Sequence, residues 1–347
     1  MKIRQSNIEL LRLVAMFFVL VIHADFWALD IPTSSDLKTD TTSTIGRLLF
    51  AAFSVVGVDT FVLISGWFGI RPNLKSTCNF IFQVYFFLLF FLFVSFFFVD
   101  ITLREAVSYL LLNNDYWFVK SYVGLLLVAP LLNAFVEKAS KKQLETFLIC
   151  FYAFQTILGW FSYGAVYIVY NGFSVFSFMG LYILARYVRL YPSVYTSISR
   201  NKCLAVYVFI NIFLTSVSTL FLVFDLPDYW VAKMASSHVN PFTILASLYL
   251  LLCFSKLRIQ SKIINKMAVS VFAVYLLHQN SFILDEYRSL MARLYQEFDG
   301  LTYLLAISLT LLLVFILAIL IDQLRIFLWR RFFEKWIQTM IANHRAN

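Results

Sequence analysis

The chain has 347 residues, of which 61% are hydrophobic and 19% aromatic, and only 14% are charged. Soluble domains carry about 25% charged residues, so this composition excludes an ordinary soluble protein and indicates a polytopic membrane protein. The net charge of +9 would suit a nucleic-acid partner, but the basic residues follow the loops between apolar segments, so we expect the lipid bilayer as a partner and no nucleic acid.

Apolar runs long enough to cross a bilayer recur along the chain. Runs of about 18–25 residues predict ten spans, near residues 8–29, 45–70, 78–99, 116–136, 143–161, 172–190, 203–224, 240–257, 267–287 and 301–322. We therefore expect an all-α polytopic membrane protein with a single membrane domain over residues 1–322. Residues 323–347 are expected to form a basic amphipathic tail on the inner leaflet.

The charges of the loops alternate along this predicted topology. Most Lys and Arg residues lie at the N-terminus and in every second loop, and the intervening loops are mainly acidic. Cytoplasmic loops of membrane proteins carry the excess of Lys and Arg. Both termini are therefore predicted to be cytoplasmic.

The first apolar segment carries Arg12 and His23 among its apolar residues. Eleven residues at about 100° each come within about 20° of three full turns, so both side chains leave one face of the helix, about 16 Å apart along its axis. Ionisable groups inside a membrane usually face a protein interior or a wet cavity. The alternative is a snorkelling arginine and a histidine bonded into the helix packing.

The second segment places a carboxylate, Asp59, inside the membrane. An intramembrane carboxylate normally has a partner, and the candidates are Arg12, His23 and His278. His278 lies about as deep in the ninth segment as His23 lies in the first, within about 5 Å on a 1.5 Å rise, so the two imidazoles could share a cavity. The alternative is a protonated or hydrogen-bonded Asp59 that only packs.

Polar and aromatic residues flank the third and fourth segments. Arg71 and Lys75 follow the second segment on the predicted cytoplasmic side. Tyr116 and Trp117 lie at the predicted outer interface, and Lys120 lies slightly deeper. These three residues either line a pocket or form an ordinary aromatic belt with a snorkelling lysine. The four cysteines lack the spacing of metal ligands, so we expect no metal.

Four motifs resemble those of one family. NIELLRLVAMFFVLVIH, with Arg12 and His23 separated by ten residues, resembles the first-helix signature of the acyltransferase-3 family of membrane acyltransferases. GVDTFVLISGWFGI resembles that family's Gly-Val-Asp…Ser-Gly motif, YWFVKSYVGLLLVAPLL its Trp-Phe segment, and VFAVYLLHQN its late Tyr-Leu-x-His motif. The four motifs follow the family's order and cover essentially the whole chain.

The resemblance implies an integral membrane protein of the bacterial inner membrane. It would move an acyl group, mostly acetyl, from cytoplasmic acyl-CoA to a hydroxyl of a cell-surface or lipid-linked polysaccharide. It implies that His23 is the catalytic histidine and that Arg12 helps to hold the donor. The chain departs from the family in one region, because only Arg71 and Lys75 stand where many members have an Arg-rich stretch.

The chemistry of the residues fits independently. Acyl transfer to an alcohol needs a base, and an imidazole titrates closest to neutral pH, so His23 is the expected base, oriented by Asp59 or His278. Arg12 at the basic inner end would bind the phosphates of acyl-CoA, and Arg71 and Lys75 could add contacts. The acceptor glycan or lipid-linked sugar is expected at Tyr116, Trp117 and Lys120.

Two other classes of protein remain open from the sequence. A transporter or flippase of polysaccharide or lipid-linked sugar could use the same buried His, Asp and Arg as a substrate or proton site. A non-catalytic subunit of a glycan-assembly complex would not need His23 for acylation.

Overall fold

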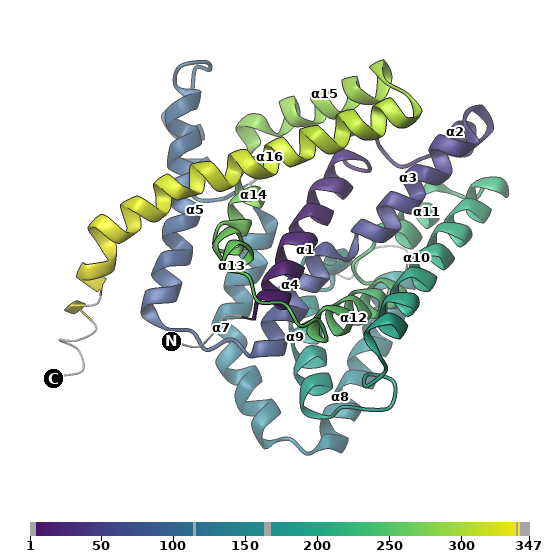
Figure 1. The fold of residues 1–347 in the computed structure, drawn as a ribbon, viewed down its shortest axis with the longest axis horizontal. Coiled ribbons are helices and arrows are strands. Elements are labelled where there is room, and N and C mark those ends of the chain that lie inside the picture. The colour runs from purple at the N-terminus through teal and green to yellow at the C-terminus, as the bar shows by residue number, and fades with distance from the viewer. Residues whose placement is uncertain (1–4, 114–115, 163–167, 338, 341–347) are drawn as a thin grey trace. The chain divides into compact units, whose positions relative to one another are not determined.

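The structure is a computed structural model, and it describes residues 5–113, 116–162, 168–337 and 339–340. Over these residues the chain forms helices and no strand, which confirms the all-α prediction (Figure 1). The helices belong to two compact units. Unit 1 comprises residues 1–70 and 118–268, and unit 2 comprises residues 71–117 and 269–347.

The helices of unit 1 come from both parts of the chain that build it. They are α1 (Ser6–Ala24), α2 (Ser34–Thr39), α3 (Thr41–Ser54), α4 (Val56–Phe68), α7 (Trp117–Lys138), α8 (Lys141–Phe154) with a π-helical extension (Gln155–Phe161), α9 (Val175–Leu190), α10 (Arg200–Val223), α11 (Asp228–Ala235), α12 (Pro241–Ser255) and α13 (Lys262–Val269). The first residue of α7 and the last residue of α13 belong to unit 2.

Each of the ten predicted spans is largely helical, but fewer are long enough to cross a membrane. In the described part of the chain, seven helices are long and apolar enough: Ser6–Ala24, Thr41–Phe68, Leu74–Ser95, Trp117–Lys138, Lys141–Phe161, Arg200–Val223 and Gly300–Ile337. The pair Lys262–His278 and Ser281–Glu297, bent by 85°, would make an eighth. Helices α9 and α12 have only 16 and 15 residues, which is short of the about 20 that a span needs.

Helix α4 lies between α1 and α9, and a glycine permits the contact on each side. A Cβ at Gly57 would lie 2.7 Å from the carbonyl oxygen of Ala15 in α1. A Cβ at Gly66 would collide with the backbone of Tyr182 in α9. Nine residues separate the two glycines, which is about 2.5 turns, so they mark opposite faces of α4. Asp59, seven residues before Gly66, shares the α9 face.

The segment between α1 and α3 contains α2. A capping box begins this helix, since the Thr33 hydroxyl accepts from the Asp36 amide and the Asp36 carboxylate accepts from the Thr33 amide. These hydrogen bonds from Thr33 lower the pKa of Asp36.

Unit 2 contains α5 (Leu74–Ser95), α6 (Leu103–Leu110), α14 (Val271–His278), α15 (Ser281–Glu297), α16 (Gly300–Leu328) and a π-helical turn (Trp329–Phe333). A buried polar network joins α16 to α5. Asp322 accepts from Gln83 of α5 at 3.0 Å and from Arg325 at 2.7 Å, and Arg325 also donates to Asn79 of α5.

This network bears on the predicted boundary between the membrane domain and the C-terminal tail. Helix α16 runs without a break past residue 322. Arg325 is buried, and its guanidinium donates to Asp322 and to Asn79 of α5. The start of the predicted tail therefore belongs to unit 2. Residues 338 and 341–347 of that tail lie outside the described residues.

Candidate active site at the end of the first helix

Helix α1 carries both Arg12 and His23. It is uninterrupted from Ser6 to Ala24, so the predicted same-face relation of Arg12 and His23 applies along its whole length. His23 lies in the last turn and is 8% exposed. Arg12 is partly exposed, and its Nη1 lies 3.1 Å from the Glu9 carboxylate. Glu9 therefore satisfies part of the guanidinium and leaves other N–H groups for an anion.

A short turn follows His23. Helix α1 ends at Ala24, and its C-cap Asp25 leaves the helical conformation at φ −103° and ψ −86°. The carbonyl of Asp25 then accepts from the amides of Ala28 and Leu29 at 3.0 and 2.7 Å. Within this turn the half-exposed Trp27 meets the His23 ring edge-on, with centroids 5.9 Å apart and planes at 81°. The turn therefore places an aromatic ring against the imidazole of His23.

Arg47 of α3 binds this turn. Its Nε lies 2.6 Å from the Asp25 carboxylate, and its Nη2 donates to the carbonyls of Leu29, at 3.3 Å, and of Asp30. Both Arg47 and Asp25 are buried. The sequence reasoning missed this pair. The available signal was an arginine inside an apolar segment, which normally has a partner, together with an aspartate two residues after His23.

Asp59 pairs with a residue that was not among its predicted partners. It is 1% exposed, and its Oδ1 lies 3.3 Å from Nδ1 of His238, in the loop between α11 and α12. Arg12 instead pairs with Glu9. Asp59 lies on the α9 face of α4, opposite the face that contacts α1, so it turns away from the helix of Arg12 and His23.

The loop before α9 encloses His238. Gly172 has φ +95°, and a Cβ there would lie 2.5 Å from the Cβ of His238. Phe173 meets the imidazole with ring centroids 5.3 Å apart, and the neighbouring Ser237 donates to Asn171 at 2.6 Å. His238 thus connects Asp59 of α4 with the two loops that precede the short helices α9 and α12.

The predicted site residues are divided between the two units. Unit 1 holds Arg12, His23, Asp59 and Lys120. Unit 2 holds Arg71, Lys75, Tyr116, Trp117 and His278.

In unit 2, the buried residues of this set form hydrogen bonds with other residues of the unit. His278 ends α14, is fully buried, and its Nδ1 lies 2.6 Å from the carbonyl of Val274. The Tyr116 hydroxyl is buried, donates to the carbonyl of Leu276 at 2.5 Å, and accepts from Asn280. Tyr116 thus binds the end of α14 and the turn after it, and Trp117 next to it begins α7.

The cationic residues Arg71, Lys75 and Lys120, which were predicted to bind donor or acceptor, differ in exposure and in ion pairing. Arg71 is exposed at the start of unit 2. Lys75 forms an ion pair with Glu334, with 2.6 Å between Nζ and Oε1. Lys120 is exposed on α7 in unit 1. Arg71 is thus the cation of unit 2 in this set that is most accessible to an anion.

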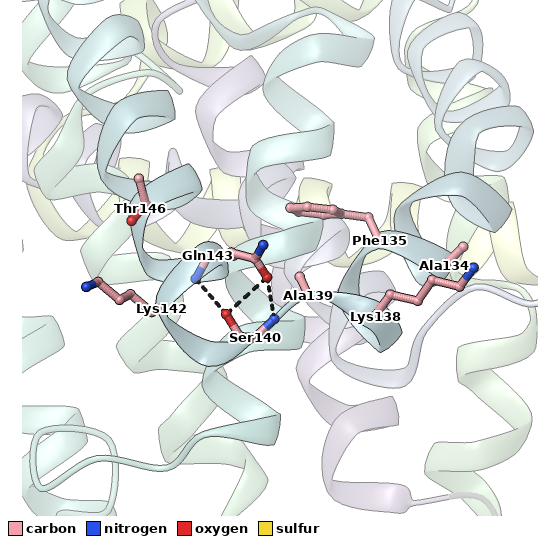
Figure 2. Close-up of a pocket in the computed structure, with 8 residues that line it drawn as sticks. All are labelled: Ala134, Phe135, Lys138, Ala139, Ser140, Lys142, Gln143 and Thr146. Atoms are coloured by element: carbon pink, nitrogen blue, oxygen red, sulfur yellow. Dashed lines mark hydrogen bonds between the residues drawn. The ribbon is translucent and has the colours of Figure 1, made fainter.

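A groove of about 830 Å³ opens at the turn between α7 and α8 (Figure 2). Ser140 and Gln143 in its wall satisfy one another in a capping box. The side chains of Lys138 and Lys142 extend to opposite sides, so they do not converge on one anion. Within unit 1 this turn lies at the end opposite the C-terminal end of α1 (Figure 1). The groove is therefore separate from the surroundings of His23.

The helices and the buried residues define a multi-pass helical membrane protein with a buried histidine at the end of its first helix. The acyltransferase-3 family model, which describes an acyltransferase domain, matches residues 5–323. The match covers nearly the whole chain, so the chain belongs to this family, and the resemblance of the four motifs is confirmed. Family membership supports a membrane acyltransferase. Comparison with curated proteins and with solved structures gives no match.

Proposed function

We propose that this protein transfers an acyl group, specifically acetyl, from cytoplasmic acyl-CoA to a hydroxyl of a cell-surface or lipid-linked polysaccharide. It would do so in a bacterial inner membrane, with both termini cytoplasmic. One observation carries the proposal: an unbroken helix α1 presents Arg12 and His23 on one face, with the imidazole buried in its last turn. The family supplies the acyl-transfer chemistry, and the donor and acceptor follow from the motifs and the polarity of α1.

His23 would act as the general base. The acceptor hydroxyl attacks the thioester carbonyl while its proton passes to the imidazole. The tetrahedral intermediate then collapses, the carbon–sulfur bond breaks, and the CoA sulfur takes the proton from the imidazolium. The products are an ester and free CoA, so the base is regenerated and no metal is needed.

Arg12 would bind a phosphate of the donor. A guanidinium has five N–H donors, and the contact with Glu9 leaves others for a phosphate oxygen. Arg71, which is exposed, and Lys75, which would have to exchange Glu334 for the phosphate, are proposed as further donor contacts. The opposed lysines of the α7–α8 groove are not part of this site.

The remaining predicted residues enter the proposal with different roles. Asp59 faces away from α1 and pairs with His238, so we assign it to the fold of unit 1 rather than to the orientation of His23. The proposed role of His278 in the reaction and those of Tyr116, Trp117 and Lys120 in acceptor binding rest on the family motifs.

The test compares surface glycans from cells that express the wild type, His23→Ala and, as a matched control, His344→Ala, a histidine that the proposal does not use. NMR of the purified glycan measures base-labile acetyl esters. We expect the ester signal to disappear with His23→Ala and to persist with His344→Ala. An undiminished signal in His23→Ala cells refutes the catalytic assignment, and transport of unmodified glycan by the wild type would favour a flippase.

A further inference from the structure

A polar side chain of α3 binds the turn that follows His23, and the turn also packs on α3 through a buried apolar cluster. Arg47 reaches from α3 to three acceptors of that turn, the carboxylate of Asp25 and the carbonyls of Leu29 and Asp30. Asp30 has φ +60°, a left-handed conformation that residues other than glycine rarely adopt. A hydrogen bond to its carbonyl stabilises that conformation, so Arg47 contributes directly to the path of the chain after α1.

A snorkelling arginine does not explain these contacts. A snorkelling side chain keeps its charged head in water, whereas Arg47 is buried and its Nε lies 2.6 Å from an equally buried carboxylate. The planar guanidinium can serve several acceptors at once, and a lysine ammonium, a point charge on a flexible stem, does not reproduce that arrangement. The site therefore requires the geometry of arginine as well as its charge.

The turn held by Arg47 contacts the imidazole of His23. Asp25 lies two residues after His23, and Trp27 meets the His23 ring edge-on. Trp27 is half-exposed, so its place against the imidazole depends on the backbone of the turn as well as on surrounding packing. Displacing the turn would shift Trp27 and loosen the last turn of α1. Proton transfer depends steeply on such positions, because a base must lie within hydrogen-bond reach of the proton it takes.

We propose that Arg47 is a positioning residue for acyl transfer, which holds the turn Asp25–Asp30 so that Trp27 orients the His23 imidazole. The inference rests on the proposed function, since it assumes that His23 is the base. It adds a residue of α3 to the catalytic apparatus without requiring that residue to touch a substrate. Trp27 is the link between Arg47 and the imidazole.

The test measures kcat, the KM for acetyl-CoA and the thermal stability of purified Arg47→Ala, Arg47→Lys and Trp27→Ala. Arg200→Ala removes an exposed arginine of unit 1 and is the matched control. We expect Arg47→Ala and Trp27→Ala each to lower kcat at least about tenfold with the KM for acetyl-CoA within about threefold. Arg47→Lys should fall between Arg47→Ala and the wild type. Wild-type kcat in either alanine variant overturns the proposal.

A double variant separates positioning from simple neutralisation of a buried charge. Arg47→Ala alone leaves the Asp25 carboxylate buried without its cation, and Asp25→Asn removes that charge. If Arg47 only neutralises Asp25, the double variant regains wild-type kcat, and the proposal fails. If Arg47 positions the turn through Leu29 and Asp30, the double variant regains thermal stability while its kcat stays low.

His23→Ala, measured in parallel, distinguishes failure of the proposed function from failure of the positioning role of Arg47. Full activity of His23→Ala refutes the proposed function itself. An inactive His23→Ala together with a fully active Arg47→Ala refutes only the positioning role. If Arg47→Ala fails to fold, Arg47→Lys and Trp27→Ala decide the question, because each leaves α3 and the cap of α1 closer to the wild-type protein.

Discussion

In the described part of unit 1, two buried pairs of ionisable side chains lie on opposite sides of its central helices. Arg47–Asp25 fastens the end of α1 to α3, next to His23. Asp59–His238 fastens α4 to the loop before α12, on the face of α4 that is turned away from α1. Both pairs hold loops at the ends of helices, but only the first lies beside the candidate base. A buried pair of ionisable side chains in a membrane protein therefore does not by itself identify the catalytic site. The helix face on which the pair lies shows whether it is close to the candidate base.

The largest expected effect is on stability, from breaking Asp59–His238. Asp59→Ala removes a fully buried carboxylate that lies against the His238 imidazole and leaves a cavity beside that imidazole, so it should lower the unfolding temperature in detergent substantially. Asp228→Ala, an exposed aspartate of the same unit, is the control and should change little. Activity per folded molecule should stay near wild type. A loss of about a hundredfold or more per folded molecule would mean that Asp59 takes part in the reaction, as the sequence motif predicted.

The two glycines of α4 allow the same substitution, Gly to Ala, to be compared on the face that contacts α1 and on the face that contacts α9. Gly57→Ala places a Cβ 2.7 Å from the Ala15 carbonyl and pushes α1 away, so it should lower kcat as well as stability, the latter by about 1–3 kcal/mol. Gly66→Ala strains the α9 face and should act through stability alone. Gly46→Ala, where no atom lies within 4 Å, is the control.

Activity and thermal stability of the three glycine variants are measured in the same detergent. Equal losses of kcat in folded Gly57→Ala and Gly66→Ala would contradict the assignment of the two faces to different roles.

A smaller effect is expected at the other end of α1. Arg12→Ala removes a proposed phosphate contact and should raise the Kd for acetyl-CoA about tenfold, the effect of about 1.4 kcal/mol. Glu9→Gln is the informative companion, because it releases Arg12 from its carboxylate and should leave the affinity unchanged or improve it. Isothermal titration of the purified protein measures both. Unchanged affinity in Arg12→Ala would place the donor elsewhere.

The features that the sequence predicted correctly depend on local geometry. The common face of Arg12 and His23 follows from helical periodicity within one segment, and α1 is unbroken over that segment. The helical content of all ten apolar runs also follows from composition. The family could be identified from the sequence because its motifs are short and contiguous.

Helix length was harder to predict because apolar runs include residues that precede the helix. The predicted sixth span began near residue 172, but α9 starts only after the N-cap Ser174. The predicted eighth span, 240–257, loses one residue to the N-cap Asn240 and two at its C-terminal end. The bend in the ninth span follows the same rule, since Asn280 caps α15 and thereby separates it from α14. Capping residues inside an apolar run were the available signal.

The tertiary partners could not be predicted from one sequence. His238 is far from Asp59 along the chain, and only the packing of α4 between α1 and α9 shows that Asp59 is turned toward His238 and away from His23. Arg47 and Asp25 were likewise separated by α2 and its loops. Such pairs depend on which helix faces meet, and hydropathy does not encode that.

The release of CoA thiol by purified protein tests the central claim most directly, because one thiol appears for each acyl group transferred. The wild type and His23→Ala are compared with acetyl-CoA and the acceptor glycan, at matched folded protein and donor occupancy. Loss of a general base predicts a rate about 10²–10⁴-fold lower in His23→Ala, with an unchanged unfolding temperature and acetyl-CoA affinity. Acceptor-dependent thiol release at the wild-type rate in His23→Ala would contradict the account.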